Sequence, residues 1–193
     1  MLIQKKILQF WKKIVVNIKT YKHVLGFAAY SGTGKTTLLK NIIPLLKNKN
    51  YKVGIIKHAH HAFDVDQKGK DSYELRKAGA SHMLITSNQR WALMVENTIN
   101  KEPNVDEYIK KFDHEDLDLI LVEGFKAQDI PKIELHRPIL GHPLLCTNDK
   151  NIIAIAIDSK LNEDINIPIL DLNNYKMIVE FIINNFSKNN SNK

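Results

Sequence analysis

The sequence has little cysteine, few arginines and no long apolar run, and each shortage excludes a class of protein. Cys146 is the only cysteine, so the chain forms neither an internal disulfide nor a zinc site built on several cysteines. A single thiol suits a reducing compartment, and we expect a cytoplasmic protein. No apolar run approaches the roughly 18 residues that a transmembrane helix needs.

The positive net charge does not indicate a nucleic-acid-binding protein. The formal net charge is +7, but six of the 28 basic residues are lysines in residues 1–23, which contain no acid. The rest of the chain contains the other 22 basic residues and all 21 acidic ones, so its net charge is almost zero. We therefore expect no surface of the kind that binds DNA or RNA.

Residues 1–23 form a basic amphipathic extension before the expected domain. Lysines alternate with apolar side chains at helical spacing, namely Ile3, Ile7, Phe10, Trp11, Ile14 and Ile18. Such a helix can dock on a partner, be an extension made from an upstream start codon, or lie on an anionic membrane, and we favour the first two. Lysine pairs interrupt the apolar stretch, so we expect no signal peptide.

The most informative stretch is 29–37 (AYSGTGKTT), which lies between a predicted strand and a predicted helix. Its ending fits the phosphate-binding P-loop pattern G-x-x-x-x-G-K-[ST]. Glycines there let backbone N–H groups converge on phosphate oxygens, and the following helix N-terminus adds positive potential. The expected phosphate-binding residues are Ser31, Gly32, Thr33, Gly34, Lys35, Thr36 and Thr37.

Two side chains of this loop have expected chemical roles, and one position departs from the pattern. Lys35 is expected to reach the β- and γ-phosphates, and the Thr36 hydroxyl to ligate Mg²⁺. Ala29 replaces the first glycine. Alanine is acceptable there only if the position does not need a positive φ.

From residue 24 onwards, short apolar runs alternate with helical patterns, which predicts an α/β fold with a mostly parallel sheet. We expect residues 24–186 to form one domain and residues 187–193 a frayed tail. The first two strands, joined by a helix, are expected to pair in parallel, and Asp71 to cap the second helix. A polar turn between 83–86 and 91–95 predicts an antiparallel β-hairpin. Besides the hairpin, strands are expected at 24–29, 52–57, 118–123, 132–136 and 152–157, and helices at 35–48, 71–78, 104–112 and 174–186.

A long polar segment follows the second predicted strand and begins with residues 57–61 (KHAHH). The spacing of its histidines matches no usual zinc site. We expect instead a loop near the phosphates, in which Lys57 contacts the nucleotide and Asp64 or Asp66 assists Mg²⁺ through water. A solvated polar loop is the alternative.

The strand at 118–123 is apolar and ends in Glu123. P-loop proteins use an acid at such a strand end to hold or orient the water shell of Mg²⁺, so Glu123 and Lys35 are the expected catalytic pair. Many buried strands end in an acid, which is the alternative explanation. The guanine-selecting sequence N-K-x-D is absent, and Asp158 is either a guanine acceptor or an exposed acid capping a strand.

Several of these stretches together resemble the molybdopterin-guanine dinucleotide biosynthesis protein B family. They are residues 28–39, 56–80, 89–94 (QRWALM) and 117–126 (LDLILVEGFK), so that the resemblance covers about residues 24–186. It implies a three-layer P-loop NTPase fold and a homodimeric adapter that binds GTP and Mg²⁺. It also implies at most weak GTPase activity, and a guanylyltransferase partner that forms molybdopterin guanine dinucleotide.

Two other functions remain as alternatives. A small-molecule P-loop kinase would use Lys35 and the 57–71 loop to transfer a γ-phosphoryl group. Kinases usually add an arginine-rich lid, whereas Arg76, Arg90 and Arg137 are scattered along this sequence. The other alternative is a scaffold docked on a membrane through residues 1–23.

Overall fold

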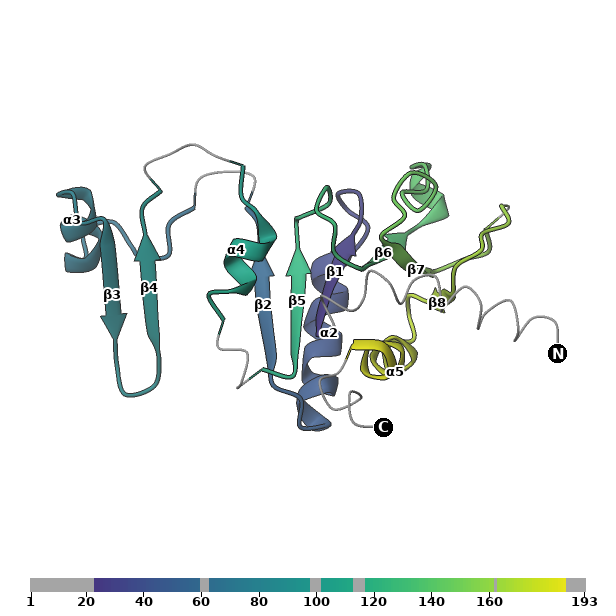
Figure 1. The fold of residues 1–193 in the computed structure, drawn as a ribbon, viewed down its shortest axis with the longest axis horizontal. Coiled ribbons are helices and arrows are strands. Elements are labelled where there is room, and N and C mark those ends of the chain that lie inside the picture. Colours follow the sequence, from purple (N-terminus) through teal and green to yellow (C-terminus); the bar gives the residue numbers. More distant parts are fainter. Residues whose placement is uncertain (1–22, 60–62, 98–101, 113–116, 162, 187–193) are drawn as a thin grey trace. The chain divides into compact units, whose positions relative to one another are not determined.

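The chain divides into two compact units (Figure 1). The computed structural model describes residues 23–59, 63–97, 102–112, 117–161 and 163–186. The larger unit contains the described residues up to His58 and from Asn104 onwards, and the hairpin unit spans Ala59–Pro103. The predicted N-terminal extension and C-terminal tail lie outside the described residues. No described helix has the length and apolar character needed to cross a bilayer.

A six-stranded parallel sheet forms the centre of the larger unit, in the order β2-β5-β1-β6-β7-β8. Strands that are covered on both faces become continuous apolar runs, and every residue of β1 and β7 is buried. The strands are β1 (Val24–Ala28), β2 (Val53–Lys57), β5 (Leu119–Glu123), β6 (Lys132–His136), β7 (Ile152–Ile157) and β8 (Ile169–Asp171).

Helices cover both faces of this sheet, which confirms the three-layer α/β prediction. On one face, Leu25 and Phe27 of β1 belong to the same apolar cluster as α2 (Lys35–Asn48) and α5 (Tyr175–Phe186). On the other face, Val24 packs in a cluster with α4 (Val105–Ile109). A short 3₁₀ helix, η1 (Pro138–Leu140), follows β6.

The hairpin unit contains α3 (Asp71–Lys77), β3 (His82–Thr86) and β4 (Trp91–Val95). The two strands are antiparallel, as predicted, with Leu84 opposite Leu93. Alternate residues lie on opposite faces of a strand. One face, with Met83 and Met94, is half-buried, whereas the other presents exposed apolar side chains: Leu84, Trp91, Leu93 and Val95.

Two predictions about the sheet are wrong. β1 and β2 are parallel but are not neighbours, because β5 lies between them. β2 is consequently an edge strand, and its Ile55 is 38% exposed instead of buried. Strand order depends on contacts between distant segments, which a local apolar pattern does not contain.

Two smaller predictions also need correction, and one short strand was not predicted. Lys70, and not Asp71, is the N-cap of α3, so the Asp71 carboxylate lies in the first turn. α4 is shorter than expected, and the Asn104 side chain caps it by accepting a hydrogen bond from Asp106 N at 2.9 Å. β8 was not expected, because three residues are too few to show a period.

Candidate phosphate-binding site

The carboxyl ends of three neighbouring strands meet beside the P-loop. The sheet register places Phe27 of β1, Glu123 of β5 and Lys57 of β2 in one row. The P-loop begins directly after β1, at the same edge. Ligands of open parallel α/β sheets bind at this carboxyl edge, so the fold brings together the predicted residues Lys35, Lys57 and Glu123.

The P-loop backbone takes the conformation that its glycines permit. Gly32 and Gly34 have φ values of 79° and 100°, in the region that L-residues rarely adopt. Ala29 is buried, and Asn50 is the only non-glycine residue with positive φ in the described chain. Ala29 therefore meets the condition for replacing the first glycine. The Thr33 side chain is buried, and its hydroxyl donates to the Tyr30 carbonyl at 2.9 Å.

The N-terminus of α2 is open to an anion. Gly34 is the N-cap and has no side chain to accept a hydrogen bond, and the first turn contains no acid. The first backbone bond of the helix runs from Leu38 N to the Gly34 carbonyl at 2.9 Å. The N–H groups of Lys35–Thr37 consequently have no partner within the helix. These amides and the helix dipole both favour a bound phosphate.

Lysines surround the Glu123 carboxylate. Lys35 Nζ lies 3.8 Å from Oε1 and Lys57 Nζ lies 3.7 Å from Oε2, while the glutamate side chain is only 13% exposed. Burial, together with the positive charge of Lys35, lowers the pKa of Lys126. The lysine charges exceed the single carboxylate charge, which gives this edge of the sheet a positive potential suited to phosphate.

The oxygen donors at this edge suit Mg²⁺. Thr36 supplies an exposed hydroxyl in the first turn of α2, and Glu123 supplies a carboxylate. Among the described residues, no group of three or more His, Cys, Asp or Glu side chains could hold a metal. Mg²⁺ usually binds through one or two protein oxygens together with substrate phosphates and water. The residues therefore fit a magnesium ion carried in with a nucleotide.

Arg137 is a site residue that sequence reasoning missed. Its Nε donates to the Thr33 carbonyl of the P-loop at 2.9 Å, and its Nη1 donates to Asp158 Oδ2 at 2.5 Å. The sequence holds one signal for it, since Arg137 directly follows a predicted strand. Only the strand order, with β6 beside β1, shows that this strand end is next to the P-loop.

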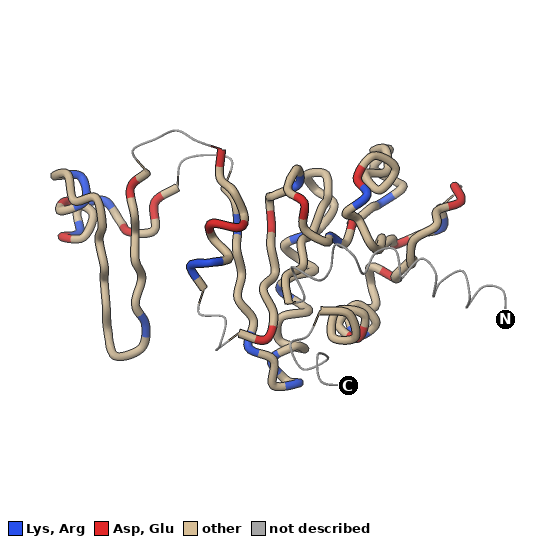
Figure 2. Tube along the Cα trace, viewed as in Figure 1, with Lys and Arg blue, Asp and Glu red and all other residues tan. Residues whose placement is uncertain are grey.

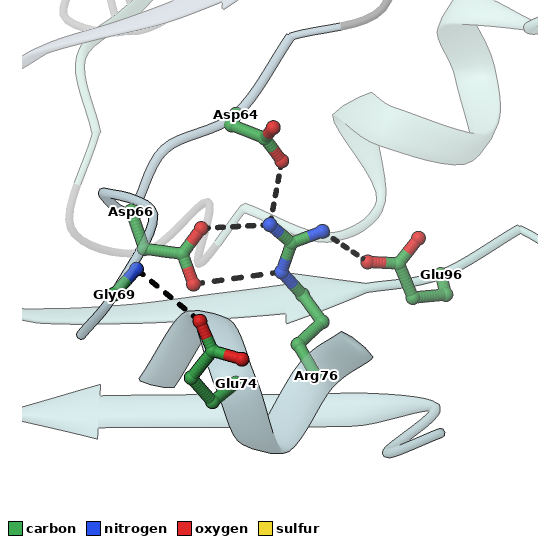
Figure 3. Close-up of polar contacts among 6 residues, drawn as sticks. All are labelled: Asp64, Asp66, Gly69, Glu74, Arg76 and Glu96. Carbon is green, nitrogen blue, oxygen red and sulfur yellow. Dashed lines mark hydrogen bonds and ion pairs between the residues drawn. The ribbon is translucent and has the colours of Figure 1, made fainter. Parts of the chain in front are cut away.

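Asp64 and Asp66 lie in the hairpin unit, where both accept hydrogen bonds from Arg76 (Figure 3). Arg76 Nη2 lies 2.5 Å from Asp64 Oδ1 and 2.7 Å from Asp66 Oδ1, and Nη1 lies 2.8 Å from Glu96 Oε1. The hydrogen bond from Arg76 lowers the pKa of Asp66. A water-mediated role for these aspartates toward Mg²⁺ stays a prediction.

Charges of both signs are interspersed along the described chain, with no long basic stretch (Figure 2). The near-neutral net charge after residue 23 therefore arises from basic and acidic residues that are mixed along the chain. The cationic side chains at the P-loop edge include Lys35, Lys57 and Lys126.

The sequence matches a family model and several curated relatives. The model described as "Molybdopterin guanine dinucleotide synthesis protein B" matches residues 24–158. Two proteins named "Molybdopterin-guanine dinucleotide biosynthesis adapter protein" are similar to this chain. The one from Escherichia coli K12 is 47% identical over 173 residues, which cover 89% of this chain and 98% of the relative. The one from Haemophilus influenzae is 42% identical and covers 83% and 88%.

Solved structures have the same fold. The crystal structure of Bacillus subtilis MobB aligns with a TM-score of 0.67 over 86% of this chain and 99% of that one, at 21% sequence identity. A crystal structure titled molybdopterin-guanine biosynthesis protein B aligns with a TM-score of 0.65, covers 83% and 97%, and is also 21% identical. At these identities the likeness shows the fold alone.

Proposed function

Because the chain belongs to the molybdopterin guanine dinucleotide synthesis protein B family, we propose that it is a Mg²⁺·GTP-binding adapter in the synthesis of molybdopterin guanine dinucleotide. The observation that carries the nucleotide part is the open N-terminus of α2 beside Lys35, Lys57 and Glu123. The adapter part rests on the names of relatives that are 42% and 47% identical.

Each predicted residue has a defined part in this proposal. The amides of Ser31–Thr37 and the ammonium of Lys35 hold the phosphates, and Lys57 adds charge at the neighbouring strand end. Thr36 and Glu123 hold Mg²⁺ directly or through water. When bound, the ion neutralises phosphate charge. Asp64 or Asp66 assists the ion through water.

Hydrolysis of GTP is expected to be slow. Two lysine ammonium groups lie within 3.8 Å of the Glu123 carboxylate. These ion pairs engage the carboxylate, and no described residue at this edge is an evident strong general base toward an attacking water. We therefore propose at most weak GTPase activity, with the guanylyltransferase as the partner that uses the bound state.

The exposed apolar face of the hairpin supports a homodimer. Leu84, Trp91 and Leu93 are 56%, 69% and 50% exposed, and they lie side by side on one face. An isolated two-stranded hairpin is marginally stable in water, and its edges readily pair with another chain. A second copy of this chain would cover that face and extend the two-stranded sheet.

Light scattering of the full chain and of a Trp91→Glu variant tests the homodimer. We expect the wild type to have the mass of a dimer and the variant to have the mass of a monomer, because a charge on the apolar face opposes its burial. Ile139→Glu is the matched control, since Ile139 is also exposed, at 87%, but lies in the larger unit. A monomeric wild type would refute the homodimer.

Calorimetry with GTP and ATP, each with Mg²⁺, tests the nucleotide assignment. We expect GTP to bind more tightly than ATP. Lys35→Ala should weaken GTP binding about tenfold or more, because a charge-assisted contact to phosphate is lost. The control is Lys40→Ala, which removes an exposed lysine of the same helix. Unchanged binding by Lys35→Ala would show that the P-loop does not hold the phosphates.

The adapter role is tested with the guanylyltransferase of the same organism. We expect the two proteins to co-elute in gel filtration and the adapter to increase the rate of molybdopterin guanine dinucleotide formation. Neither effect would appear if the adapter proposal is wrong. Rapid phosphorylation of an added acceptor would instead support the kinase alternative.

A further inference from the structure

Arg137 links the P-loop to the ends of β6 and β7. We propose that Arg137 is a positioning residue for phosphate binding, which fixes the Thr33–Gly34 peptide so that its N–H faces the bound phosphate. This inference rests on the proposed nucleotide site and names a residue of that site. In this role Arg137 fixes the conformation of the loop more than it adds positive charge to it.

The hydrogen bond from Arg137 determines the orientation of one peptide group. Nε donates to the Thr33 carbonyl at 2.9 Å. In a planar trans peptide the carbonyl and the following N–H point in opposite directions. Holding the Thr33 oxygen toward Arg137 therefore turns the Gly34 N–H away from it, toward the concave side of the loop where the other amides converge.

The conformation of Gly34 shows that this orientation needs support. Its φ of 100° belongs to a region that is shallow for glycine, so the loop can leave this conformation at little cost. A Cβ at Gly34 would lie 3.6 Å from Arg137 Nη2. The guanidinium thus packs beside the flexible residue and also bonds the carbonyl that precedes it.

Asp158 holds the guanidinium in place. Arg137 and Asp158 each directly follow a strand, and their strands are neighbours, with His136 opposite Ile157. The bond of 2.5 Å between Nη1 and Oδ2 joins them, and the Asp158 side chain is only 17% exposed. The sheet therefore anchors Arg137 on one side while Nε reaches the P-loop on the other.

The contacts of Arg137 allow a positioning role to be distinguished by mutation from a role of its charge alone. The Asp158 carboxylate neutralises much of the arginine charge at short range. The planar guanidinium donates in two fixed directions, to Thr33 and to Asp158, whereas a lysine ammonium has no such fork. A positioning role therefore predicts that lysine does not replace Arg137, and a charge role predicts that it does.

The test compares Arg137→Lys, Arg137→Ala, Asp158→Asn and the control Lys40→Ala in calorimetry with Mg²⁺·GTP and with inorganic pyrophosphate. We expect both Arg137 variants to bind each probe about tenfold or more weakly than wild type, as for loss of a charged hydrogen bond. Asp158→Asn should weaken binding less, since its amide oxygen still accepts from arginine. Tight binding by either Arg137→Lys or Arg137→Ala would overturn the inference.

A second measurement works without any ligand. The amide resonance of Gly34 in ¹H–¹⁵N spectra of the full chain should shift in Arg137→Lys and stay unchanged in Lys40→Ala. An unchanged Gly34 resonance in a folded Arg137→Lys protein would overturn the inference. A wild type that binds neither probe would instead refute the proposed nucleotide site, and the Gly34 resonance would then show only whether Arg137 fixes the Thr33–Gly34 peptide.

Discussion

Gly124 follows Glu123 with a φ of 96°, and a Cβ at this position would lie 2.7 Å from the His58 carbonyl oxygen. The close approach exists because His58 N donates to the Glu123 carbonyl at 2.8 Å, which joins the ends of β2 and β5. The backbone that presents Glu123 to the P-loop therefore requires glycine next to it, for both conformation and space.

Replacing Gly124 by alanine should destabilise the protein by about 2–4 kcal/mol, from the strain of positive φ and the contact with His58. Gly141→Ala is the matched control, because Gly141 also has positive φ, at 65°, with nothing near its Cβ position. That control should cost only about 1 kcal/mol. Urea denaturation measures both values, and equal losses would show that the His58 contact is unimportant.

Cys146 has a pKa raised to about 12 by burial of the thiol and, secondarily, by the charge of Glu134. Only the thiolate reacts with alkylating agents. We therefore expect iodoacetamide to modify the native protein at pH 8 at least about 100-fold more slowly than it modifies a free thiol. The protein unfolded in urea serves as the control, and equal rates in both states would contradict the prediction.

At the scale of elements, the hairpin unit depends on one arginine. Arg76 of α3 bonds Asp64 and Asp66 before the helix and Glu96 after β4, so a single guanidinium joins three segments. The side chains of Arg76 and Asp66 are 8% and 7% exposed. The core of the hairpin unit is small, and this polar cluster contributes to holding its helix and strands together.

Because the hydrogen bond with Arg76 lowers the pKa of Asp66 in the folded state, Asp66 stabilises that state at pH values above its unfolded pKa, about 3.9. This contribution is lost as the pH falls through the lower folded value. We expect Asp66→Asn to have a lower melting temperature than wild type at pH 7, and the difference to shrink toward pH 3. A difference independent of pH would rule out this linkage.

The sequence was sufficient to predict the elements that depend on local patterns. The apolar runs of β1 and β7, the turn before Trp91 and the P-loop glycines all lie where the pattern put them. It was insufficient for features that arise from strand order, such as the insertion of β5 between β1 and β2 and the approach of Arg137 to Thr33. The pairing of Asp64 and Asp66 with Arg76 likewise joins separate segments. The sequence shows that each of these residues is charged, but it does not show which ones pair.

At the scale of the whole molecule, nucleotide binding should stabilise the chain unevenly. A ligand at 100 times its dissociation constant stabilises the state that binds it by about 2.7 kcal/mol. With saturating Mg²⁺·GTP we expect hydrogen exchange to slow most in the P-loop and in β5. Slower exchange at residues 63–66 would support the water-mediated role of Asp64 and Asp66, and unchanged exchange there would refute it. Unchanged exchange throughout the P-loop would contradict nucleotide binding itself.

The position of β5 between β1 and β2 also orders events during synthesis of the chain. Neither β1 nor β2 has its β5 partner until residue 123 has left the ribosome, whereas β3 and β4 are complete at residue 95. Segments nearer the N-terminus leave the ribosome first during synthesis. The hairpin with its apolar face therefore emerges before the strand that carries Glu123, so the dimer surface proposed above is complete before the phosphate site is.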